Sequence, residues 1–260
     1  MSVDVHYGLS GPQDAPVVAL LSSLGTDMSM WDPQVPVVSR RFRVLRYDLR
    51  GHGKSPVPAG PYSIADLGGD LLGLLDRLEI ESAHICGVSI GGMTGIWTAA
   101  HDPERVRRLV VCCSSVYLDP EGTYRERAKL VRDGGVEQIA DAALARWFTT
   151  EWLMENPGAA TSMWRRLVAI PREGYAGCCE ALAEMDLRPK LDAVRAPTLV
   201  ISGEDDPATP PAHGRAIANG IRGSRFETVA HAAHLASIEQ SRRVTELIMG
   251  HLLQDEEEPR

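Results

Sequence analysis

The chain has 260 residues, of which 44% are hydrophobic, and this suits one large domain or one domain with an inserted subdomain. Its formal net charge of −8 at pH 7 argues against nucleic acid as a partner. The N-terminus lacks the features of a signal peptide, and no apolar run is long enough to cross a membrane. We therefore expect a cytoplasmic protein with no membrane partner.

The apolar pattern predicts a mostly parallel sheet. Residues 3–7 alternate between apolar and polar side chains, which is typical of a strand with one solvated face. The later strands include a continuous apolar run at residues 16–21, as expected when both faces of a sheet are covered. They are predicted at residues 16–21, 42–47, 83–86, 106–113, 197–201 and 225–229. Helical patterns alternate with these runs, and this order favours an α/β fold with helices on both faces of the sheet.

The first long helix is predicted from Ser63 to Leu78. Ser63 and Asp66 have the spacing of a capping box, and a leucine stripe starts at Leu67. Further helices are expected at residues 93–100, 125–131, 137–148, 160–168, 211–220 and 237–253.

The alternation of strand and helix stops over residues 119–191, where helical segments dominate, and it resumes with the strand at 197–201. This interruption predicts an inserted helical cap at residues 119–191. Residues 1–118 and 192–254 would then form the core, and residues 255–260 an acidic, solvated tail.

The glycine-rich segment 48–55 ends in Gly53-Lys54-Ser55, like a phosphate-binding loop. Asp48 stands where that motif needs a glycine, and the following prolines prevent a helix that would point at phosphates. We therefore reject nucleotide binding and expect His52 to brace its loop.

The cysteines give no sign of a metal site. They are Cys86 and the adjacent pairs at 112–113 and 178–179, without a C-x-x-C spacing. We expect reduced, mostly buried thiols, no metal and no other cofactor.

A serine motif stands at the junction of a strand and a helix. Gly87, Ser89 and Gly91 form the G-x-S-x-G pattern of a nucleophile elbow, between the apolar run 83–86 and the helical segment 93–100. Side chains at the two glycines would collide with neighbouring backbone in so tight a turn. The pattern predicts an exposed hydroxyl at a helix N-terminus, where negative charge is favoured.

An acid and a histidine follow the last two strands. The acid is Asp205 or Asp206, and the histidine is His231 or His234. Ligands of parallel sheets bind beyond the carboxyl ends of the strands, so these groups are expected beside Ser89. The chain order of serine, acid and histidine fits a hydrolase in which histidine takes the serine proton and a carboxylate orients the histidine. The residues alone leave both pairs open.

The whole chain resembles the α/β-hydrolase superfamily and, within it, the 3-oxoadipate enol-lactonases. The resemblance rests on Ser22-Ser23-Leu24-Gly25-Thr26-Asp27, on the elbow and on residues 30–34, 48–55, 146–149, 174–181, 185–188 and 234–240. Two positions depart from the common pattern: Ala233 replaces a frequent glycine, and Ser22-Ser23 replaces His-Gly. The resemblance implies an α/β-hydrolase fold with a mostly parallel eight-stranded sheet, flanking helices and a helical cap.

The resemblance also implies roles for individual residues. The acid stands three positions after Gly203, which gives Asp206, and the histidine ahead of the Leu-x-x-x-Glu pattern is His234. The oxyanion hole would be the backbone N–H groups of Leu24 and Ile90. Trp147 is a candidate wall of the substrate pocket.

The implied reaction is hydrolysis of 3-oxoadipate enol-lactone, a small-molecule partner, in the β-ketoadipate pathway of aromatic-compound catabolism. The substrate carboxylate needs a cation or hydrogen-bond donors, and the cap arginines Arg125, Arg132, Arg146, Arg165 and Arg166 are candidates of which none is assigned. Alternatives are a hydrolase of another ester or of a carbon–carbon bond, a perhydrolase, or a ligand receptor on the same fold. The sequence gives no expectation for oligomeric state.

Overall fold

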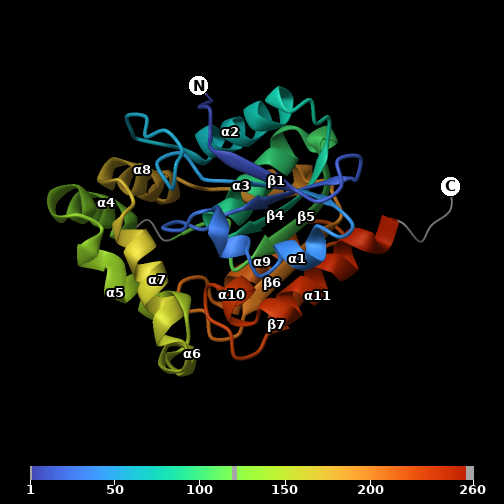
Figure 1. Cartoon of the computed structure of the whole chain (residues 1–260). Coiled ribbons are helices and arrows are strands. Elements are labelled where there is room, and N and C mark those ends of the chain that lie inside the picture. Colours follow the sequence, from blue (N-terminus) through green and yellow to red (C-terminus); the bar gives the residue numbers. More distant parts are fainter. Residues whose placement is uncertain (1, 119–121, 256–260) are drawn as a thin grey trace.

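The computed structural model describes residues 2–118 and 122–255 (Figure 1). A seven-stranded sheet runs in the order β1-β3-β2-β4-β5-β6-β7. Neighbouring strands are parallel except for β1, which pairs with β3 in the antiparallel direction. The strands are β1 (Tyr7–Ser10), β2 (Val17–Leu21), β3 (Arg43–Tyr47), β4 (Ala83–Val88), β5 (Val106–Cys112), β6 (Thr198–Gly203) and β7 (Arg225–Val229).

The expected count of eight strands is wrong for the described residues, and the opening strand begins at Tyr7 rather than at residue 3. The N-terminal segment turns away from the sheet. The Val3 amide donates to Asp70 Oδ1 at 2.7 Å, and the Val5 amide donates to the Val3 carbonyl at 3.0 Å. Since these two amides are bonded elsewhere, residues 3–5 form no strand before β1.

Helices cover both faces of the sheet, as predicted. In Figure 1, α2 and α3 lie over one face, and α1 and α11 lie together under the other. The helices of this part are α1 (Val35–Val38), α2 (Ile64–Arg77), α3 (Ile90–His101), α9 (Pro211–Gly220), α10 (Ala236–Glu239) and α11 (Ser241–Leu252). Short 3-10 turns are η1 (Met28–Trp31), η2 (Pro103–Arg105), η3 (Arg188–Ala193) and η4 (Leu253–Asp255).

Two helix predictions can be checked at their ends. The Ser63 capping box is confirmed, because the Asp66 amide donates to Ser63 Oγ at 3.1 Å and the Ser63 amide donates to Asp66 Oδ2 at 3.0 Å. The single final helix is wrong: Gln240 has φ −118° and ψ 48°, which no α-helix allows, and it separates α10 from α11.

Five helices stand between β5 and β6, grouped at one side of the sheet in Figure 1. They are α4 (Thr123–Gly134), α5 (Glu137–Trp147), α6 (Thr150–Glu155), α7 (Pro157–Val168) and α8 (Arg172–Ala183). The sequence patterns indicated α4, α5 and α7.

We propose that residues 119–191 form a cap on a core of residues 1–118 and 192–254. Residues 119–121 and most of the acidic tail lie outside the described residues.

Helix α8 lies very close to the glycine-rich segment 48–55. A side chain at Gly174 would place its Cβ 2.0 Å from the Gly51 carbonyl oxygen, and one at Gly51 would meet Gly174 Cα at 2.3 Å. Gly51 also has a positive φ of 74°, which favours glycine. This glycine-to-glycine contact lets α8 dock on the core segment.

The same segment braces the loop after β2. The Gly25 amide donates to His52 Nε2 at 3.1 Å, and His52 Nδ1 lies 3.2 Å from the Arg50 carbonyl. Asp48 accepts from the Met28 amide at 2.8 Å. The expectation that His52 braces its loop is confirmed. Burial lowers the pKa of His52 to about 4, so the ring is neutral at pH 7 and its Nε2 is free to accept.

We expect Gly174→Ala to lower the free energy of unfolding by about 2 kcal/mol, because the added methyl group overlaps the Gly51 backbone. Gly69→Ala is the matched control in α2, where an added Cβ meets nothing within 4 Å. That control should gain about 0.5–1 kcal/mol from helix propensity. Urea denaturation measures both, and equal stability of the two variants would contradict the close contact.

The free energy of unfolding should fall as the pH drops from 6.5 to about 4. Burial lowers the pKa values of His52 and His251 to about 4, whereas an unfolded histidine titrates near 6.5. In this window the unfolded chain binds protons that the folded chain does not, and each histidine can cost up to about 3 kcal/mol. Below about pH 4 both states are protonated and these two groups cause no further loss.

The control for this pH dependence is His52→Gln, whose amide oxygen can still accept from Gly25. Urea denaturation at several pH values should show a shallower fall for the variant, since one of the two histidines is gone. A fall as steep as that of the wild type would exclude His52 as its source.

Candidate active site

The turn at Ser89 has the strained geometry of a nucleophile elbow. Ser89 joins β4 to α3 with φ 56° and ψ −119°, a conformation that side chains rarely adopt. A Cβ on Gly87 would lie 2.3 Å from the Gly91 carbonyl carbon, and a Cβ on Gly91 would lie 2.5 Å from the Leu21 oxygen. The predicted collision of side chains at both glycines with neighbouring backbone is thus confirmed.

Backbone contacts fix Ser89 at the carboxyl end of β4. Its amide donates to the Cys112 carbonyl of β5 at 2.9 Å, and its carbonyl accepts from Ser114 Oγ at 2.8 Å. Only 6% of the residue is exposed, and it lines a cavity of about 360 Å³. The strained turn therefore presents the serine to a confined space beyond the edge of the sheet.

Asp206 and His234 are the acid and histidine that the structure brings together. Asp206 Oδ2 lies 2.9 Å from His234 Nδ1, and both side chains are buried. Asp206 also accepts from the amides of Ala208 and Thr209, at 2.8 and 3.0 Å, and from the Thr209 hydroxyl at 2.8 Å. His234 lines the same cavity as Ser89.

Burial raises the pKa of the Asp206 carboxyl, but His234 and the Thr209 hydrogen bonds outweigh it and hold this pKa below its usual value. Asp206 is therefore ionised near neutral pH. An ionised acceptor at Nδ1 keeps the proton on that nitrogen and leaves Nε2 of His234 without one.

The alternative pair lies elsewhere. Asp205 and His231 are exposed and line a separate surface pocket with Phe148 and Thr149. Neither residue lines the cavity of Ser89. Geometry separates two pairs that the residue pattern alone left equal.

Leu24 and Ile90 are the two residues whose amides the sequence suggested as an oxyanion hole. Leu24 lines the cavity of Ser89 and lies in the loop that His52 braces through Gly25. Ile90 is the first residue of α3, where the N–H has no helical acceptor. Their role as an oxyanion hole remains a proposal.

Glu239 links the histidine loop to the helical segment. Its Oε2 accepts from the Ala233 amide at 2.7 Å, and its Oε1 accepts from the Thr149 amide at 3.0 Å. The Leu235 amide donates to the Trp147 carbonyl at 2.9 Å across the same junction. These bonds fix the residues on either side of His234 relative to the end of α5.

Two arginines enter the cavity from α4 and α5. Arg127 and Arg146 both line it, and within the described ranges neither forms an ion pair with a carboxylate. Burial, followed by the like charge of Arg127, lowers the pKa of Arg146. The cavity therefore holds a concentrated positive charge that suits an anionic ligand.

The other candidate arginines are engaged outside this cavity or exposed. Arg125 pairs with Glu184, Arg132 with Glu173 and Glu180, and Arg166 with Ser29. Arg165 lies exposed on α7. Sequence reasoning missed Arg127, although its spacing from Thr123 and Tyr124, which also line the cavity, is that of one helix face.

Trp147 forms a wall of the cavity, at the end of α5. Only 5% of it is exposed, and its indole ring would lie 3.0 Å from a Cβ placed on Gly25, next to Leu24. The tryptophan thus packs against the loop that Leu24 belongs to and lines the same cavity as Ser89.

The described residues hold no group of three or more His, Cys, Asp or Glu side chains that could bind a metal ion. In the same ranges no helix is both long and apolar enough to cross a bilayer. The five cysteines are free and buried, and burial raises the pKa values of Cys86 and Cys178, so neither forms a thiolate readily.

Comparisons with known proteins agree with this geometry. A family model described as the alpha/beta hydrolase fold matches residues 16–241. The chain is 41% identical to 3-oxoadipate enol-lactonase 2 of Acinetobacter baylyi, over 92% of this chain and 89% of that protein. It is 36% identical to 3-oxoadipate enol-lactonase 1 of the same organism, over 93% and 90%.

Among solved structures, the enol-lactonase from Burkholderia xenovorans superposes with a TM-score of 0.95 at 41% identity, covering 97% of each chain. Fold and sequence agree along most of the chain. The chain belongs to the α/β-hydrolase family.

Proposed function

We propose that this chain is a cytoplasmic serine hydrolase that opens 3-oxoadipate enol-lactone to 3-oxoadipate. One observation supports the proposal above others: a single cavity joins Ser89 and the His234–Asp206 pair to two arginines without a carboxylate partner among the described residues. An ester-cleaving group and an anion-binding group in one cavity suit a lactone that bears a carboxylate. The names of the two Acinetobacter relatives give the same reaction.

In the first half of the reaction, Ser89 attacks the lactone carbonyl. His234 Nε2 takes the hydroxyl proton, and Asp206 stabilises the resulting imidazolium through Nδ1. The negative charge on the carbonyl oxygen is stabilised by the amides of Leu24 and Ile90; in support, Leu24 lines the cavity of Ser89 and Ile90 follows Ser89 at the start of α3. Because these donors are backbone groups, the departure at Ser22-Ser23 leaves the chemistry unchanged.

Collapse of this intermediate breaks the ring carbon–oxygen bond and leaves an acyl-enzyme on Ser89. The departing oxygen is an enol, which is a better leaving group than a simple alkoxide, and the imidazolium of His234 supplies its proton. In the second half, His234 takes a proton from water, which attacks the acyl-enzyme. The imidazolium then returns this proton to Ser89 as the serine–acyl bond breaks, which frees the product acid and restores the enzyme. Tautomerisation of the enol to the ketone then draws the reaction forward.

Arg127 and Arg146 bind the substrate carboxylate in this proposal. They reach the cavity from two neighbouring helices, and their charges repel each other until an anion lies between them. The carboxylate is therefore held on the helical side, while the lactone ring faces Ser89 at the edge of the sheet.

Asp206→Asn should lower kcat for the enol-lactone by about 10⁴-fold, because the amide no longer fixes the His234 tautomer. Asp205→Asn is the matched control one residue away, and it should stay within about twofold of wild type since its side chain is exposed. The assay is spectrophotometric loss of the enol-lactone. Ser89→Ala should lose activity at least as completely, and substantial turnover by that variant would refute the proposal.

Arg127→Gln and Arg146→Gln should each raise KM for the enol-lactone by about 10- to 100-fold, the loss expected for a hydrogen bond to a charged group. Hydrolysis of p-nitrophenyl acetate, which has no carboxylate, should change little. Arg125→Gln is the control, because Arg125 pairs with Glu184 at the surface. An equal loss on both substrates would assign the two arginines a structural role instead.

A further inference from the structure

A second cavity, of about 220 Å³, lies on the other side of the Trp147 wall. The loop after β2 supplies one side through Gly25, Met30 and Pro33, and α7 supplies the other through Ala159 and Met163. Three charged side chains also line the cavity, but Asp27 lies 3.9 Å from Arg166 and Asp32 pairs with Arg46 at 2.6 Å. Because these charges are paired, the remaining apolar wall suits a hydrocarbon chain better than a charged group.

Trp147 is the one described residue that lines both cavities. Its ring lies over Gly25, where a Cβ would come within 3.0 Å of the indole and 2.9 Å of Leu167. Gly25 faces the second cavity and its neighbour Leu24 faces the first. The indole ring therefore separates the space beside Ser89 from the space beside α7.

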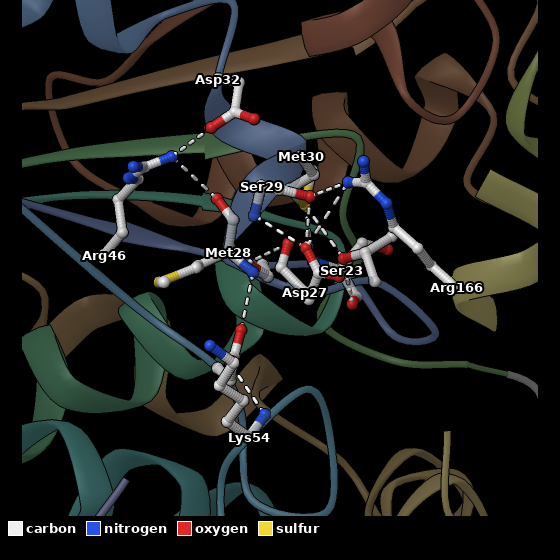
Figure 2. A network of polar contacts seen from close by, with 12 residues as sticks. Ser23, Asp27, Met28, Ser29, Met30, Asp32, Arg46, Lys54 and Arg166 are labelled. Atoms are coloured by element: carbon white, nitrogen blue, oxygen red, sulfur yellow. Dashed lines mark hydrogen bonds and ion pairs between the residues drawn. The ribbon is translucent and has the colours of Figure 1, made fainter. Parts of the chain in front are cut away.

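Polar contacts tie the two sides of the second cavity together (Figure 2). Arg166 of α7 donates to the Ser29 hydroxyl and lies 3.9 Å from Asp27 Oδ1. The Ser29 amide donates to the same carboxylate at 2.8 Å, and the Ser23 amide donates to Met30 Sδ at 3.2 Å. These contacts join α7 to the loop and keep the cavity walls in place.

We propose that Trp147 is the specificity-determining partition of this enzyme. The second cavity would then be an extension of the pocket that holds the acyl group on Ser89, and the indole ring shuts this extension off from that pocket. The inference rests on the proposed function, because it takes Ser89 as the nucleophile. The tryptophan limits the wild type to short, compact substrates such as a lactone ring. Removal of the indole connects the two cavities and admits long, uncharged acyl chains to Ser89.

The test compares p-nitrophenyl octanoate with p-nitrophenyl acetate. In Trp147→Ala the ratio of kcat/KM for the two esters should rise about tenfold over wild type, as expected when a pocket gains room for several methylene groups. Trp147→Leu keeps more apolar volume and should show a smaller rise in the same direction. Circular dichroism checks the fold of both variants. An unchanged ratio in a folded variant overturns the inference.

A second substitution identifies which space the longer chain uses. Ala159→Phe fills the second cavity from an exposed position on α7, and in the Trp147→Ala background it should return the ratio to the wild-type value. Thr161→Phe, exposed on the same helix but outside both cavities, should leave the gain intact. A gain that survives Ala159→Phe would place the chain in the first cavity and refute the extension.

The two proposals fail in different ways. If wild type opens the enol-lactone but Trp147→Ala gains nothing on the octanoate, only the partition is wrong. The opposite outcome is that the wild type does not hydrolyse the enol-lactone, while Trp147→Ala gains a Ser89-dependent activity on the octanoate and Ala159→Phe removes this gain. In that case only the proposed substrate is wrong.

Discussion

The strained turn at Ser89 is the constraint on which the rest of the structure depends. A positive φ at a serine costs about 1–3 kcal/mol, and it persists because β4 and α3 are held on both sides. The chain reverses so sharply that Gly91 packs against the Leu21 carbonyl of β2 and Gly87 against Gly91 itself. No other residue fits there, and the outcome is a hydroxyl at the N-terminus of α3, facing the cavity.

Around this turn, loops from separate parts of the chain are held by hydrogen bonds between backbone amides and buried or half-buried side chains. His52 holds the Gly25 amide, Asp48 holds the Met28 amide, and Glu239 holds the Ala233 amide. The glycine-rich segment that looks like a phosphate loop thus serves as a brace. Its glycines allow close approach: a Cβ at Gly53 would lie 2.2 Å from the Asp48 carboxylate.

The sheet and the inserted helices contribute different residues to the cavity. The sheet edge supplies Ser89 and the His234–Asp206 pair, whose geometry suits many esters. The helices α4 and α5 supply the arginine pair and Trp147, which line the same cavity and which we propose select the charge and the size of the substrate. The junction between the two parts runs through Glu239 and the Gly51–Gly174 contact, so the pocket walls are fixed relative to the nucleophile.

The sequence by itself determined the features that depend on neighbouring residues: the elbow glycines, the Ser63 capping box, the buried strands and the brace at His52. It left Asp205 and Asp206 equal, because adjacent residues of a turn differ only in the direction that the fold gives their side chains. Resemblance favoured Asp206 and His234. The tertiary structure selects the same pair, because it brings His234 Nδ1 within 2.9 Å of Asp206 Oδ2. Arg127 went unnoticed for a related reason: the face that α4 turns toward Ser89 is set by docking against α8 and α5, which helical periodicity does not encode. The apolar pattern predicted seven strands, as the structure has them over the described residues, and only the resemblance added an eighth.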